Sequence, residues 1–221
     1  MVQVPVAIPP KRERTRSAII AAAIAVIAEH GLEAANIDAL MHSAGMSRGT
    51  FYNYFPSRDA VLWAVVDHIC ERVASEVAGR LPDDLGPEAL VACMILGFLQ
   101  FGSNNPELGW AQVHIGGGTP WLVPDDPAIN RFQNLNAALS QLLGDDAALA
   151  LGIAYIEGVA LMALRRLLEQ RIAGDDVARL VAFTLRGLDV PRQRIAPAVE
   201  VARRFAETLR HRPLQAQTRE R

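Results

Sequence analysis

Helical patterning runs through almost the whole of this chain of 221 residues. Apolar residues recur at helical spacing in one segment after another, and glycine and proline separate the segments. The alternation of apolar and polar residues that marks a half-buried strand is absent. Hydrophobic residues make up 51% of the chain, enough to form a substantial core. The sequence therefore predicts an all-α protein.

The helix start and stop signals predict the boundaries of these segments. Gly31 is placed to end the first long helix, Asn36 and Ser47 are placed to cap two short ones, and Pro56 interrupts the chain before the next. A last amphipathic helix follows Pro191. The expected helices, caps included, cover residues 15–30, 36–43, 47–55, 58–80, 87–103, 105–116, 127–143, 146–172, 176–188 and 192–211.

Composition excludes several classes of protein. The net charge of −2 predicts no general affinity for nucleic acid, so a nucleic-acid partner would need a local basic patch. Cys70 and Cys93 form no disulfide framework or metal motif, and the histidines have no metal-ligand spacing. A basic segment before residues 18–28 imitates a signal peptide, but no cleavage site follows it. We therefore expect a cytoplasmic protein with no cofactor, no metal, no membrane partner and no catalytic site.

The stretch AGMSRGTFYNYF, residues 44–55, joins two short helices through a tight turn. Such a turn with a glycine, here Gly45, is typical of a helix-turn-helix. Phe51 and Phe55 can face the core together with Ile27 of the first helix. The first turn after Ser47 is then small and polar, so it can enter a major groove, while the tyrosines at its far end can reach phosphate oxygens.

From about Arg16 to Ala64 the chain resembles the DNA-binding domain of the TetR family of transcriptional repressors. The matching stretches are AIIAAAIAVIAEHG and NIDALMHSAGMSRGTFYNYFPSRDAVLWAV. Farther along, YIEGVALMAL and FTLRGLDV resemble the last two helices of the family core. The resemblance implies an all-helical homodimer that binds operator DNA through its N-terminal domain and a small-molecule effector through its C-terminal domain. Ile27 departs from the family's usual Phe, and Asp38 departs from a usual polar or basic residue.

The resemblance also implies which residues contact DNA. Arg48 is the expected reader of guanine, because its guanidinium can make a bidentate contact. Asp38 is left out, because a carboxylate there repels phosphate unless it accepts from a cytosine amine. Arg12, Arg14 and Arg16 form either an arm that reaches DNA or a solvated helix start. The expected DNA-binding residues are Asn36, Ser47, Arg48, Gly49, Thr50, Tyr52, Asn53, Tyr54 and Arg58, with Ser47, Tyr54 and Arg58 on phosphates.

The predicted domains are a flexible tail at 1–10, the helix-turn-helix domain at 11–72, a ligand-binding and dimerisation domain at 73–211, and a second tail at 212–221. Candidate pocket residues are Met94, Phe98, Trp110, His114, Phe132, Tyr155, Glu157 and Met162, although aromatic residues at helical spacing are more often plain core. Candidate dimer residues are Leu151, Ala154, Gly158, Leu161, Leu180, Phe183 and Gly187. Glu157 is either a pocket acceptor or an interface hydrogen-bonding group.

The predicted function is a sequence-specific transcriptional regulator, most simply a repressor that a small apolar or aromatic effector releases from its operator. The helix at 58–80 is the only expected segment that both abuts the helix-turn-helix and reaches the C-terminal domain, so we expect it to couple the two. Two alternatives stay open: a helical enzyme, and a ligand-binding or interaction protein without a DNA function.

Overall fold

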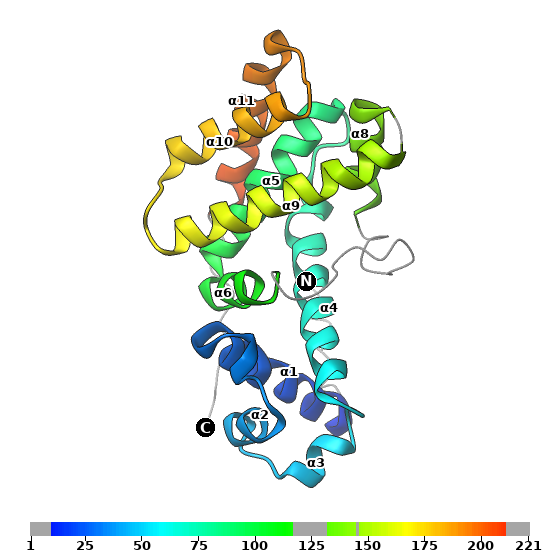
Figure 1. Ribbon diagram of the computed structural model, residues 1–221, viewed down its shortest axis with the longest axis vertical. Helices are drawn as coiled ribbons and strands as arrows, with labels where there is room; N and C mark the ends of the chain where they lie inside the picture. The colour runs from blue at the N-terminus through cyan, green and yellow to red at the C-terminus, as the bar shows by residue number, and fades with distance from the viewer. Residues whose placement is uncertain (1–9, 117–131, 145, 211–221) are drawn as a thin grey trace, which may run out of the picture.

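The computed structural model describes residues 10–116, 132–144 and 146–210. Within these ranges every regular element is a helix, as the sequence predicts. The molecule is elongated, with the N-terminal helices at one end and the remaining helices bundled at the other (Figure 1). The two predicted tails lie outside the described ranges, except for residue 10, and so does the start of the helix expected at 127–143.

The N-terminal end contains three helices and the first part of a fourth. The sequence does not predict the short 3-10 turn η1 that follows α1. The third helix is shorter than expected, because Asn53 already ends it and a turn leads on to Phe55. The elements are α1 (Lys11–His30), η1 (Leu32–Ala34), α2 (Ile37–Ala44), α3 (Arg48–Tyr52) and α4 (Arg58–Glu76).

The second end is a bundle around α5, which is buried on most of its surface because it is apolar almost all round. α8, α9, α10 and α11 all pack against it. The elements are η2 (Ala78–Arg80), α5 (Pro87–Asn104), α6 (Pro106–Ile115), α8 (Gln133–Leu143), α9 (Asp146–Leu168), α10 (Gly174–Gly187) and α11 (Arg192–Leu209).

The C-terminal helix α11 is an integral part of this bundle. It packs along α5 more extensively than any other pair of elements packs. Its apolar stripe, which includes Ile195, Ala202 and Phe205, is buried. At the rim, Arg194 Nε lies 3.0 Å from Glu88 Oε1 in an ion pair that ties the start of α11 to the start of α5.

Two elements connect the two ends of the molecule. α4 runs from the helix-turn-helix into the bundle (Figure 1). α6 packs broadly against α1, and its His114 lies beside Gly31 at the end of α1. The expectation that the helix at 58–80 is the only link is therefore wrong. The sequence places α6 in the C-terminal part of the chain, and only the fold brings it back onto α1.

Candidate DNA-binding surface and ligand pocket

The helix-turn-helix is fixed by side-chain caps at each helix start. Asn36 accepts from the amide of Ala39 at the start of α2, over 3.0 Å. Ser47 accepts from the amide of Thr50 at the start of α3, over 3.2 Å. Between them Gly45 adopts φ +64°, the left-handed conformation that favours glycine. These contacts set the angle at which α3 leaves the body of the domain.

The predicted DNA-contacting residues of α3 lie on its outer face. Arg48, Gly49, Tyr52 and Asn53 are exposed, and Thr50 is half-buried. The opposite face is anchored by Phe51, which is fully buried and lies edge-on to the ring of Tyr52. α3 lies at the far tip of the molecule, away from the bundle (Figure 1). The buried ring of Phe51 therefore fixes α3 to the domain, and the exposed polar face of α3 is accessible to a large partner.

Arg48 forms an ion pair that the sequence analysis did not predict. Its Nη1 lies 3.3 Å from Oδ2 of Asp38 on α2, and both side chains are largely exposed. The carboxylate of Asp38, which by itself would repel phosphate, therefore has a positively charged partner on α3, the second helix of the helix-turn-helix. We call α3 the recognition helix below. In this position Asp38 can orient the guanidinium of Arg48, although an exposed pair of this kind contributes little to stability.

Arg58 is engaged with the protein backbone. Its Nε donates to the carbonyl of Ala35 over 2.7 Å, and its Nη2 donates to the carbonyl of Leu32 over 2.6 Å. These bonds tie the first turn of α4 to the segment between α1 and α2. The structure thus places the predicted phosphate-binding arginine in a positioning role.

A hollow with two arginines lies between the start of α1 and the residues that follow α3. Arg12, Glu13, Arg16 and Tyr54 line it. The guanidinium of Arg16 also stacks over the ring of Phe55, 5.1 Å from its centroid. Arg12 and Arg16 thus lie on the same side as the predicted phosphate contact Tyr54. This is the kind of local positive patch that a chain of net charge −2 needs in order to bind DNA.

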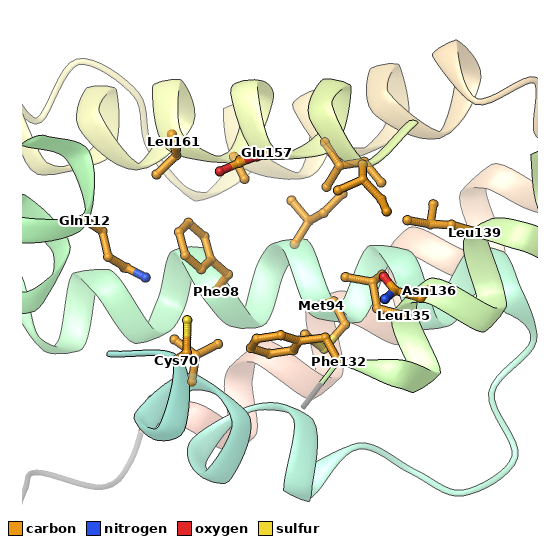
Figure 2. Close-up of a pocket in the computed structure, with 15 residues that line it drawn as sticks. Cys70, Met94, Phe98, Gln112, Phe132, Leu135, Asn136, Leu139, Glu157 and Leu161 are labelled. Atoms are coloured by element: carbon orange, nitrogen blue, oxygen red, sulfur yellow. The ribbon is translucent and has the colours of Figure 1, made fainter. Parts of the chain in front are cut away.

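The bundle contains an apolar cavity of about 220 Å³ between α4, α5, α6, α8 and α9 (Figure 2). Four of the predicted pocket residues line it, namely Met94, Phe98, Phe132 and Glu157. The other four lie elsewhere. On α6 the helical period directs Gln112 into the cavity, so Trp110 and His114 stack on each other away from it. On α9, Tyr155 and Met162 lie on the exposed face.

Glu157 and Gln112 are two of the polar side chains that line the pocket, and the sequence analysis predicted only one of them. Glu157 was predicted, and its partial burial raises the pKa of the carboxyl. Gln112 was missed. It is buried, and its Oε1 has no hydrogen-bond partner among the described residues. The available signal was its spacing, because Gln112 falls on the same helical stripe as the apolar Leu108 and Ile115.

The outer face of α9 and α10 is unusually apolar. Leu151, Tyr155, Met162 and Phe183 are 73%, 40%, 53% and 61% exposed. Gly158 lies among them with open space beside it. Of the predicted dimer residues, Leu151, Ala154, Gly158, Phe183 and Gly187 are exposed, Leu180 is half-buried, and Leu161 lines the pocket instead.

The helix α9 also has a composition that a membrane span would share. Residues Ala147–Leu168 are long and apolar enough to cross a bilayer, by length and composition alone. Glu157 interrupts this apolar run. One side of α9 packs against α5, α6 and α8, and that packing accounts for part of its apolar character.

The described residues thus form a capped helix-turn-helix with an exposed polar face on α3, joined by the long helix α4 to a bundle with an apolar pocket. Residues 19–65 match the family model described as bacterial regulatory proteins, tetR family. The N-terminal domain of the chain is therefore similar to that of the TetR family over these residues.

Two relatives illustrate the sequence similarity. YvdT of Bacillus subtilis, an uncharacterized HTH-type transcriptional regulator, is 39% identical over 66 residues, which are 30% of this chain and 34% of YvdT. The HTH-type transcriptional regulator EthR of Mycobacterium tuberculosis is 33% identical over 99 residues, 43% of this chain and 46% of EthR. The chain thus spans less than half of the length of these curated relatives.

The likeness to solved structures covers most of the chain. RolR, solved in complex with resorcinol, is 25% identical with a TM-score of 0.58, over 88% of this chain and 95% of RolR. A TetR-like transcriptional regulator from Rhodococcus sp. RHA1 gives a TM-score of 0.61 at 19% identity, over 84% of this chain and 100% of that one. The C-terminal bundle therefore shares the fold of these regulators.

Proposed function

We propose that the protein is a sequence-specific transcriptional regulator of the cytoplasm that binds operator DNA as a homodimer and releases it when a small, largely apolar molecule binds. The exposed polar face of α3, set on the buried Phe51 in a TetR-family domain, carries the proposal. The relatives YvdT and EthR are described as transcriptional regulators, and RolR was solved with a small aromatic ligand, which supports both parts.

In the DNA complex, α3 enters the major groove with Arg48 reading a guanine. Gly49 lets the backbone approach the bases closely, and Thr50, Tyr52 and Asn53 complete the surface. Phosphate contacts come from Ser47, Tyr54 and the hollow with two arginines. Asn36 and Arg58 act mainly by holding α2 and α4 in place, because their polar atoms already bond to backbone.

The experiment is an electrophoretic shift with the DNA upstream of the protein's own coding sequence. The wild type should shift this fragment in the presence of excess unrelated DNA. Arg48→Ala should lose the selectivity, while Arg203→Ala, which removes the same charge from an exposed site on α11, should bind normally. Equal shifts of operator and unrelated DNA by the wild type would contradict the proposal.

The dimer forms through the exposed apolar face of α9 and α10. A patch of this kind on a soluble protein marks an interaction surface, and a two-fold axis would pair it with its own copy. Pairing would make a four-helix interface and would cover the large exposed side chains Leu151, Met162 and Phe183. The same pairing explains the apolar composition of α9 without a membrane.

The pocket couples to DNA through both elements that connect the two ends. Cys70 and Val73 of α4 line the pocket, and so does Gln112 of α6, which packs on α1. A ligand that favours one position of α4 and α6 therefore changes the separation of the two recognition helices in the dimer. The ligand releases DNA only if it binds the conformation whose helix separation does not fit DNA more tightly than it binds the DNA-binding conformation.

A further inference from the structure

We propose that the pocket's ligand is an apolar molecule that carries a hydroxyl or a protonated amine at one end, which donates to the carboxylate of Glu157 beside the amide of Gln112. The proposal rests on the proposed function and deepens it, because it specifies the chemistry of the effector. It depends on this chain's own side chains in the cavity.

The first observation is the unpartnered amide of Gln112. The side chain is 7% exposed, and its Oε1 is buried without a hydrogen-bond partner among the described residues. Buried polar atoms without partners are uncommon in folded proteins. The oxygen itself is closed off from the cavity, and Figure 2 shows the amide nitrogen of Gln112 pointing into it. A hydroxyl on the ligand can accept from this nitrogen while it donates to Glu157, and a ligand end without a polar atom forgoes both hydrogen bonds.

The second observation is the carboxyl of Glu157 in an apolar surround. On α9 it lines the cavity together with Ile153, Ile156 and Ala160. Burial raises the pKa of this carboxyl, which shows that its environment disfavours the charge. No lysine or arginine is among the described residues that line the cavity. A donor on the ligand would therefore supply the partner that the carboxylate lacks there.

The third observation is the arrangement of the polar groups. Gln112 and Glu157 lie toward the end of the pocket that holds Phe98 and Leu161, and Asn136 lies toward the other end (Figure 2). The volume of about 220 Å³ exceeds the roughly 150 Å³ of an apolar cavity that binds benzene. The cavity thus fits one aromatic ring and a short chain, with the donor placed at the Gln112 end.

The test uses four probes that share a phenyl ring and a short chain but differ at the chain's end. Phenylpropanol carries a neutral donor, phenylpropylamine a charged donor, butylbenzene none, and phenylpropionate a carboxylate. Calorimetric titration of the wild type should show the alcohol or the amine binding on the order of tenfold more tightly than butylbenzene. Phenylpropionate should bind most weakly, because its charge repels that of Glu157.

The variants assign the preference to the two polar side chains. Gln112→Met keeps the length of the side chain and removes its amide, so the advantage of the alcohol over butylbenzene should shrink severalfold. Glu157→Gln removes the charge, so the advantage of the amine should disappear. Asn136→Leu changes a polar residue at the other end of the same pocket and should preserve both preferences. Cooperative thermal unfolding of each variant confirms that it folds.

The outcomes separate this inference from the proposed function. Equal binding of butylbenzene and the two donor probes, unchanged preferences in Gln112→Met and Glu157→Gln, or no binding of any probe up to its solubility would each overturn the inference. Operator release by a donor-free molecule would overturn it as well, while the proposed function stood. Selective binding of a donor probe that leaves operator affinity unchanged would support the inference and contradict effector release by that probe.

Discussion

At the scale of single residues, Arg48 and Arg58 lie in different surroundings. The guanidinium of Arg48 is largely exposed and paired only with the equally exposed Asp38. The guanidinium of Arg58 is half-buried and donates to the carbonyls of Leu32 and Ala35. Both residues are expected to matter for DNA binding, but for different physical reasons.

Arg58→Ala should therefore weaken binding to all DNA sequences alike and also destabilise the protein. It leaves two backbone carbonyls without their charged donor, which we expect to cost about 1–3 kcal/mol of folding free energy. Chemical denaturation measures the loss, and Arg14→Ala, an exposed arginine of α1, is the control. A variant of unchanged stability with weakened DNA binding would instead assign Arg58 to phosphate contact.

Glu157→Gln should raise the thermal stability at neutral pH. The pKa of Glu157 is raised in the folded protein, so the folded state binds its proton more tightly than the unfolded state does. Its cost to stability is absent below the unfolded pKa, near pH 4, and grows as pH rises through the folded pKa. The difference in Tm between the variant and the wild type should increase as pH rises. Glu207→Gln, on the exposed side of α11, is the control. A constant difference from acid to neutral pH would contradict this.

At the scale of elements, the sequence predicts the helices well because their signals are local. Asn36, Ser47 and Gly45 act within one turn of their own position, and the structure confirms all three as capping or turn residues. The pocket was only partly predictable, because it is built from five helices that are distant in sequence. Composition identified Phe98 and Glu157, but only the rotation of each helix decides which side chains face the cavity.

The corner between α5 and α6 shows a contact that the sequence could not reveal. A Cβ atom on Gly109 would lie 2.9 Å from the backbone carbonyl oxygen of Gly102, so the two helices approach as closely as glycine permits. Gly109→Ala should destabilise the protein by roughly 1–3 kcal/mol, because the backbone of α5 must move. Thermal unfolding measures this, with Gly174→Ala as control, since the nearest atom to a Cβ there is Arg210 Nη2, at 3.9 Å. Equal effects of the two substitutions would contradict the close approach.

At the scale of the whole molecule, the account requires a dimer that sets the spacing of two recognition helices. Leu151→Glu places a charge on the exposed face of α9, which we expect to be the dimer interface. Light scattering should show a dimer for the wild type at micromolar concentration and a monomer for the variant. Val201→Glu, on the exposed side of α11, should stay dimeric. A monomeric wild type would contradict this arrangement.

The most direct measurement of the central claim is a footprint on the DNA upstream of the protein's own coding sequence. A dimer with two copies of α3 should protect a roughly palindromic site, with half-sites in successive major grooves about 34 Å apart. Arg48→Ala should lose protection of that site at protein concentrations where Arg203→Ala retains it. Uniform protection along the fragment, or the same footprint for both variants, would show that α3 does not read sequence.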